Sequence, residues 1–178
     1  MTAAITLTPA TVAVSTDASF DAFYRAEADG LCRALTLALG NADLAREATD
    51  EGLVRAYQHW RKISAYDNPA GWVYRVALNW ARSRLRKTKR EVITDDIRDV
   101  AASWSTEPGL LQAIQHLPLE FRSVVVLRYL LQWSTAEVAE ALEVPTGTVK
   151  SRLARALEQL RVNLADEEDD ATDEEVSP

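Results

Sequence analysis

Residues 134–161, STAEVAEALEVPTGTVKSRLARALEQLR, have the pattern of two helices separated by a short break. Ser134 and Glu137 have the spacing of a capping box, in which the two residues cap the start of a helix reciprocally. The Glu-Val-Pro segment at 143–145 interrupts this helix, and a second helix is predicted to begin near Thr146. Two helices joined by a turn of about three residues form a helix-turn-helix. The stretch therefore predicts a helical domain that binds DNA.

The second helix of this pair has an apolar side and a polar, basic side. We expect its apolar side to pack inward through Val149, Leu153, Ala156, Leu157 and Leu160. The residues at its N-terminal end reach base edges and phosphates in a recognition helix. The candidates for DNA contact on the polar side are Thr146, Thr148, Lys150, Ser151, Arg152 and Arg155. A helical hairpin with a solvated basic face remains the alternative.

A basic edge is predicted on another helix, upstream in the chain. Asn68-Pro69 marks the start of this helix, because a capping residue followed by proline is typical of a first turn, and the helix continues to about Lys87. At about 100° per residue, four side chains fall within an arc of about 60°. They are Arg75, Asn79, Arg82 and Arg86. Three guanidinium groups and an amide on one edge suit a nucleic-acid backbone, and a solvated face is the alternative.

The rest of the chain also has helical periodicity. Few glycines and prolines interrupt residues 17–90, and we expect two helices there, over about 17–39 and 41–63. Their expected buried stripes are Phe20, Tyr24, Leu31, Leu35 and Ala38 in the first helix and Leu44, Ala48, Leu53, Tyr57 and Trp60 in the second. The fold class is therefore predicted as all-α, with two small helical domains joined by a flexible linker. The predicted segments are a disordered N-terminus (1–16), a first domain (17–90), a linker (91–107), a second domain with the helix-turn-helix (108–163) and an acidic disordered tail (164–178).

The composition excludes several classes of protein. The single Cys32 cannot form an intrachain disulfide, and with only two histidines the 178 residues offer no spacing for a structural zinc site. A nuclease or recombinase would need clustered acids or a nucleophile with a base partner, and the sequence offers neither. We therefore expect no catalytic residue, no metal and no cofactor. The first 16 residues lack the basic start of a secretory signal, and no apolar run is long enough to cross a bilayer, so we expect a cytoplasmic protein without membrane insertion.

Charge is distributed unevenly along the chain. The last 13 residues hold 8 of the 27 acids and no base, although the formal net charge of the whole chain is only −7. A basic block at residues 82–90 and an acidic tail elsewhere suggest a polyanionic partner. Two roles remain open for the tail: it competes with DNA phosphates for Lys150, Arg152 and Arg155, or it only keeps the protein soluble.

Residues 18–162 resemble the extracytoplasmic-function (ECF, group IV) sigma factors, which are two-domain promoter-specificity subunits of bacterial RNA polymerase. In the second domain, the stretch from Leu117 to Arg161 carries the resemblance, and TVKSRL at 148–153 is its most specific part. In the first domain it rests on NPAGWVYRVALNWARSRLRK (68–87) and DLAREATDEGLVRAYQHW (43–60). The chain departs from the family at two places. Glu143 stands where the family usually has glycine in the turn, and Asp-Glu-Gly-Leu at 50–53 stands where Gln-Glu and an apolar pair are usual.

The resemblance implies a role for each candidate residue. Residues 17–90 would be sigma region 2 and residues 108–163 sigma region 4, so the recognition-helix candidates would read the −35 element. The basic edge would follow the −10 strand, and the preceding loop would hold a flipped base through Tyr66 stacking and hydrogen bonds from Asp67 or Asn68. Asp50, Glu51 and Arg55 would contact the polymerase clamp.

The implied function is that of a sigma factor without chemistry of its own. It would bind core RNA polymerase, direct it to promoter DNA through the −10 and −35 elements, and promote melting. A stand-alone dimeric helix-turn-helix regulator is the alternative, but it would leave the basic edge of the first domain unexplained. The sequence leaves open the promoters, the inducing signal, whether an anti-sigma factor is a partner, and the role of Trp104.

Overall fold

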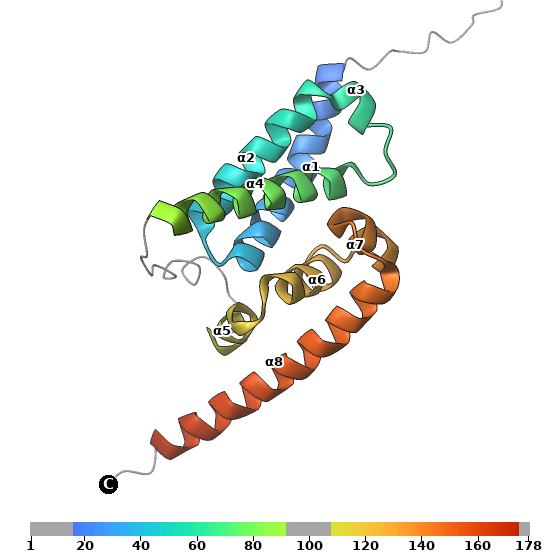
Figure 1. Ribbon diagram of the computed structural model, residues 1–178. Helices are drawn as coiled ribbons and strands as arrows, with labels where there is room; N and C mark the ends of the chain where they lie inside the picture. Colours follow the sequence, from blue (N-terminus) through green and yellow to red (C-terminus); the bar gives the residue numbers. More distant parts are fainter. Residues whose placement is uncertain (1–15, 92–107, 175–178) are drawn as a thin grey trace, which may run out of the picture.

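The computed structural model describes the backbone of residues 16–91 and 108–174, and the side chains of residues 18–87 and 109–164. The described residues form eight α-helices and no strand, so the all-α prediction is confirmed (Figure 1). The predicted linker, including Trp104, lies outside the described residues. The first half of the chain contains α1 (Thr16–Leu39), α2 (Ala42–Gln58), α3 (Trp60–Ile63) and α4 (Pro69–Glu91). The second half contains α5 (Pro108–His116), α6 (Leu119–Tyr129), α7 (Thr135–Leu142) and α8 (Thr146–Glu174).

Two helix starts predicted from capping residues are confirmed, and Asn41 caps a third helix. The Asn41 side chain accepts a hydrogen bond from the backbone N–H of Leu44 at 2.8 Å at the start of α2. The Asn68 side chain accepts one from the backbone N–H of Gly71 at 2.7 Å in the first turn of α4. Ser134 and Glu137 form a complete capping box at the start of α7. These caps bond backbone N–H groups that have no partner within the helix.

The second helix is shorter than predicted. Instead of reaching residue 63, α2 ends at Gln58, and the separate turn α3 follows His59, whose φ and ψ are −118° and 18°. After this break Trp60 is buried against Phe20 and Phe23, with ring centroids 5.2 and 4.7 Å apart. Packing of this aromatic cluster outweighs the continuation of one regular helix.

The two halves share one hydrophobic core. Buried side chains of the first half, such as Leu31 and Tyr74, belong to the same cluster as Leu127 and Val138 of the second half. In Figure 1, α5, α6 and α7 lie against α1 and α4, and α8 packs on the other side of these three helices. The described halves therefore pack as one body.

Polar and aromatic contacts also join the two halves. The Gln115 side-chain amide donates a hydrogen bond to the backbone carbonyl of Leu37 at 2.9 Å. The Tyr74 and Trp133 rings meet edge to face, with centroids 6.2 Å apart. These contacts tie α5 to the end of α1, and α4 to the segment that precedes α7.

The glycine in the departure at residues 50–53 has a packing reason. A Cβ atom on Gly52 would lie 3.0 Å from the backbone oxygen of Val73 and 3.1 Å from its Cγ1. Only a residue without a side chain allows α2 and α4 to approach this closely. Glycine inside a helix is less stable than alanine by about 1 kcal/mol, and the close packing of α2 on α4 explains why glycine nevertheless stands here.

Three apolar residues are more exposed than the periodicity predicts. Tyr24 and Tyr57 were assigned to buried stripes, but they are 48% and 51% exposed. Leu157, assigned to the inner face of the recognition helix, is 42% exposed. Each lies at the flank of an apolar stripe, where burial depends on whether another element covers the flank, and periodicity does not determine this.

The expectation of a disordered acidic tail from residue 164 is wrong as far as Glu174. The backbone of α8 is helical from Thr146 to that residue. At about 1.5 Å per residue, Asp166 lies about 16 Å beyond Arg155 along the axis. A continuous helix cannot fold back on itself, so residues up to Glu174 cannot cover the start of α8 in this arrangement.

Candidate nucleic-acid interface

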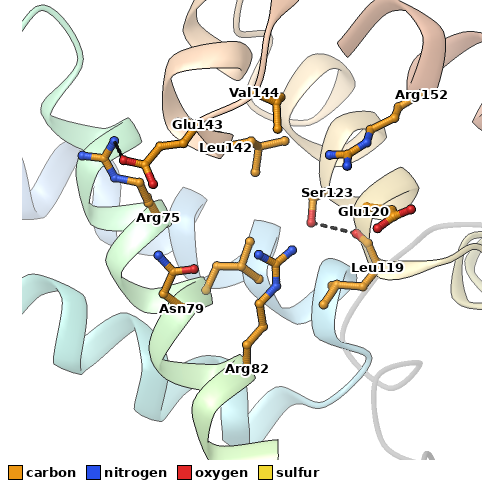
Figure 2. Close-up of a pocket in the computed structure, with 12 residues that line it drawn as sticks. Arg75, Asn79, Arg82, Leu119, Glu120, Ser123, Leu142, Glu143, Val144 and Arg152 are labelled. Atoms are coloured by element: carbon orange, nitrogen blue, oxygen red, sulfur yellow. Dashed lines mark hydrogen bonds and ion pairs between the residues drawn. The ribbon is translucent and has the colours of Figure 1, made fainter. Parts of the chain in front are cut away.

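The basic edge of α4 faces the second half of the protein. Arg75, Asn79 and Arg82 line one wall of a cleft of about 400 Å³. Figure 2 shows these side chains projecting from α4 toward the residues that close the cleft from the other side. Arg86 lies one turn further along α4, exposed and outside the cleft. We call these four residues the α4 edge; Arg75 and Arg82 are partly buried in the cleft, whereas Asn79 lines it but stays exposed.

The opposite wall comes from α6, the turn after α7, and α8. Its residues are Leu119, Glu120, Ser123, Ala141, Leu142, Glu143, Val144 and Arg152. Glu143 forms the direct polar link across the cleft: its Oε1 lies 3.1 Å from a terminal nitrogen of Arg75, as Figure 2 shows. The Arg75 side chain is 25% exposed and that of Glu143 65%.

Glu143 occupies a backbone conformation that favours glycine. Its φ and ψ are 54° and 45°, in the left-handed region, and its N–H bonds to carbonyl groups at the end of α7. A residue with a Cβ is strained there by roughly 1–2 kcal/mol. Glycine would therefore be less strained in this turn. Glutamate is more strained, but its carboxylate can pair with Arg75.

The recognition helix presents a smaller basic surface than predicted. Lys150, Ser151 and Arg155 are exposed, and we call these three residues the α8 tip. Thr146 is also exposed, whereas Thr148 is only half-buried and its carbonyl accepts a hydrogen bond from Ser151. The tip is accessible to duplex DNA in the described structure.

Arg152 does not lie on the exposed face that the sequence analysis assigned to it. It is half-buried and lines the cleft between the halves. Val149, Ala156 and Leu160 define the buried stripe of α8, and Arg152 lies about 60° from the centre of that stripe at about 100° per residue. Arg152 therefore lies on the flank of the stripe that borders the cleft, across from the α4 edge.

A second cavity, of about 240 Å³, adjoins the loop before α4. Tyr66, Asn68, Gly71, Trp72 and Arg75 of the first half line it, together with Glu140 and Ala141 of α7, and we call it the loop pocket. Asn68 is only 9% exposed; its carbonyl oxygen caps α4, while its amide nitrogen has no hydrogen-bond partner in the described structure. Of the two residues predicted to hydrogen-bond a flipped base, Asn68 lines the pocket, whereas Asp67 is exposed and lies outside it.

A third surface, which the sequence analysis missed, lies between α1 and α2. A largely apolar groove of about 460 Å³ is lined by Phe20, Asp21, Tyr24, Asp50, Leu53, Val54 and Tyr57, and we call it the aromatic groove. Of the predicted polymerase contacts, Asp50 lines this groove, while Glu51 and Arg55 pair with each other at 2.6 Å along α2. A second apolar stripe on α2, formed by Val54 and Tyr57 beside the buried one, is the signal in the sequence that could have revealed the groove.

Two buried polar groups near the junction of the halves lack partners. Burial raises the pKa of Tyr74 to about 12, although the nearby Ser123 hydroxyl and the charges of Arg82 and Arg122 offset part of this effect. Burial also lowers the pKa of Arg122. The Tyr74 hydroxyl and the Arg122 Nε have no hydrogen-bond partner among the described residues. Such groups cost free energy when the halves are packed together.

The described residues contain no group of three His, Cys, Asp or Glu side chains that could hold a metal ion. Among the described helices, none is long and apolar enough to cross a membrane.

Comparison of the sequence with known families gives two matches. Sigma-70 region 2 matches residues 23–91, and Sigma-70 region 4 matches residues 109–160. The first match spans the α4 edge, the loop pocket and most of the aromatic groove, and the second contains the helix-turn-helix.

Curated relatives match most of the chain. The ECF RNA polymerase sigma factor SigW of Bacillus subtilis is 30% identical over 148 residues, covering 72% of this chain and 79% of the relative. The RNA polymerase sigma-E factor of Streptomyces avermitilis is 34% identical, covering 85% of this chain and 88% of the relative. The ECF sigma factor SigL of Mycobacterium tuberculosis is 33% identical, with coverages of 80% and 87%.

A solved structure has a similar fold. It is the sigma factor RpoE of Bartonella quintana, in complex with the anti-sigma factor NepR. The TM-score is 0.73 at 20% identity, and the match covers 83% of this chain and 97% of the other.

Proposed function

The chain belongs to the extracytoplasmic-function sigma factors of bacterial RNA polymerase, and on this premise we propose which of its surfaces contact promoter DNA and which contact the polymerase. As a sigma factor, the protein binds core RNA polymerase and directs it to promoters to initiate transcription. It is not an enzyme, and the stand-alone helix-turn-helix regulator is not favoured, because both sigma regions are present in one chain. Its place of action is then the cytoplasm.

We assign the −10 element to region 2, residues 17–90. The α4 edge follows the phosphates of the separated strand, since guanidinium groups bind phosphate oxygens bidentately. The loop pocket accepts a flipped base, with the half-buried Tyr66 as a stacking surface. Its support is the free donor on Asn68, a buried amide without a partner that is available to a base edge.

We assign the −35 element to region 4, residues 108–163. The α8 tip enters the major groove, where Arg155 or Lys150 donates to base acceptors, while Thr146 binds near a phosphate. The exposure of all three residues supports this assignment. Arg152 contributes only after the cleft opens, because it is half-buried and lines the cleft, while the half-buried Thr148 presents less surface than the tip.

We assign polymerase binding to the aromatic groove and its rim. Exposed Tyr24, Val54 and Tyr57 offer apolar area that is enriched in protein interfaces, and Asp50 adds charge at the edge. Glu51 and Arg55 already neutralise each other, so we expect them to contribute less than the groove does. An anti-sigma protein is a further partner that we propose, by analogy with the complex formed by the related fold.

The observation that carries the proposed function is the accessible α8 tip on a chain with both sigma regions. The test is a pull-down with core RNA polymerase followed by run-off transcription on genomic promoter fragments. We expect Val54→Asp to weaken capture of the polymerase, because it places a charge in the apolar groove, while Arg46→Asp serves as a charge-changing control on the same helix outside the groove. A chain that dimerises and binds duplex DNA tightly, but captures no polymerase, would refute the proposal.

A further inference from the structure

We propose that this sigma factor inhibits itself: region 4 closes over the −10 surface of region 2, and the Glu143 carboxylate takes the place of a DNA phosphate on Arg75. The inference rests on the proposed function of the α4 edge, and it adds regulation of that site by the chain itself.

One helix covers both parts of the −10 surface. Ala141 of α7 lines the cleft over the α4 edge and also the loop pocket, and Glu140 closes the loop pocket beside it. The shared core fixes this position, since Val138 and Ala139 of α7 belong to the same hydrophobic cluster as Val73 and Tyr74 of α4. A DNA strand along α4 and a base in the loop pocket would both have to displace α7.

The Glu143 side chain has the chemistry of the ligand that it excludes. Its carboxylate oxygen lies 3.1 Å from the Arg75 guanidinium, at the distance and with the charge of a phosphate contact. The residue reaches Arg75 from a left-handed backbone position where glycine would be less strained. Glycine at position 143 would therefore give a less strained turn. What glutamate adds is the ion pair with Arg75 (Figure 2).

The closed arrangement is incompatible with reading both promoter elements together. Elements one and a half turns of DNA apart are separated by about 50 Å, at roughly 34 Å per turn. In the closed form the α4 edge and α8 lie on two walls of the same cleft. The 16 residues between Glu91 and Pro108 can span about 55 Å when extended, so the connection permits the halves to separate.

The junction also contains groups that favour opening. The Tyr74 hydroxyl and the Arg122 Nε are buried there without partners, and water would satisfy both once the halves part. The Arg75–Glu143 pair is partly exposed, and pairs of this kind shift an equilibrium by up to about fivefold. The Arg75–Glu143 pair is therefore weak enough for polymerase and DNA to separate the two halves.

The test measures binding of the free, full-length protein to a fluorescein-labelled single-stranded oligonucleotide over a series of salt concentrations. We expect Glu143→Gln to bind about twofold to fivefold more tightly than the wild type, because Arg75 becomes available. The slope of log K against log salt should become steeper by about 0.7, which corresponds to one additional phosphate contact on a single strand. Glu143→Gly should behave in the same way, and its backbone suits the turn even if the glutamine variant folds poorly.

Glu120→Gln is the matched control. It removes a carboxylate from the same wall of the cleft, but Glu120 makes no ion pair among the described residues, so affinity and salt slope should stay at the wild-type values. Equal affinities and slopes for wild type, Glu143→Gln and Glu143→Gly would overturn the inference, as would an equal gain in Glu120→Gln. Failure of the proposed function gives a different result, in which wild type with core polymerase yields no promoter-specific transcript.

Discussion

The α4 edge and the α8 tip are both basic helix surfaces assigned to promoter DNA, but the structure treats them differently. The edge faces a cleft closed by the other half of the protein, whereas the tip is open to solvent. Nothing in the two helices themselves accounts for this, since each has a buried stripe and a basic side. The contrast shows that accessibility depends on the packing between the halves: this packing partly buries Arg75 and Arg82 of the α4 edge and leaves the α8 tip exposed.

The largest effect is expected from reversing charge on the α4 edge. Arg82→Glu combined with Arg86→Glu should abolish open-complex formation, because two phosphate contacts become repulsive, while polymerase binding through the aromatic groove persists. Permanganate footprinting of promoter complexes measures the melting. Normal melting by the double variant would show that the α4 edge is only a solvated face.

The next effect separates the open surface from the covered one on a single helix. Arg155→Ala should weaken recognition of the −35 element by about 1–3 kcal/mol if the exposed guanidinium makes a bidentate base contact. Arg152→Ala should cost less, because that side chain lies in the cleft. Binding of the polymerase complex to promoter fragments with altered −35 sequences measures both, and equal losses would contradict the assignment of the tip.

A smaller effect is expected from loosening the helix that covers α4. Ser134→Ala removes the side chain that caps α7 and should lower the free energy of unfolding by about 1 kcal/mol. Urea denaturation followed by circular dichroism measures the change. Ser151→Ala is the control, since its hydroxyl bonds only within the first turns of α8 and no cap depends on it; a similar loss in both variants would argue against the cap.

The smallest effect concerns the pH dependence of that same cap. Hydrogen bonds from the Ser134 side chain and backbone lower the pKa of Glu137 below its ordinary value of 4.5. A carboxyl group whose pKa is lower in the folded state stabilises the protein above its ordinary pKa, and this contribution disappears as the pH falls through the lowered value. Between pH 6 and about pH 3, the free energy of unfolding of the wild type should therefore fall more than that of Glu137→Gln. Parallel pH profiles for the two proteins would contradict this prediction.

Local signals predicted the fold well. Asn68 and Ser134 cap helices as expected, because capping depends on residues within four positions of each other. Pro145 separates the two helices of the helix-turn-helix, also as expected. The location of the basic surfaces also follows from helical periodicity. What their residues contact is a separate question, and periodicity does not answer it.

The features that the sequence did not predict all depend on contacts between distant segments. Arg152 lines a cleft whose other wall comes from the first half, and Tyr57 stays exposed because none of the described helices covers that flank of α2. Glu143 was recognised only as a departure in the turn, since its partner Arg75 lies 68 positions away in the chain. Pairings of this kind require the fold itself.

Gly52 has a mechanical consequence for the whole of region 2. At this point α2 contributes no side chain to its contact with α4, and only the backbone oxygen of Val73 and the short side chains of Val73 and Ala77 lie next to Gly52. The close approach therefore couples the position of α2, to which we assign polymerase binding, to that of α4, to which we assign the −10 strand. An alanine at position 52 would shift one helix relative to the other by a few tenths of an ångström.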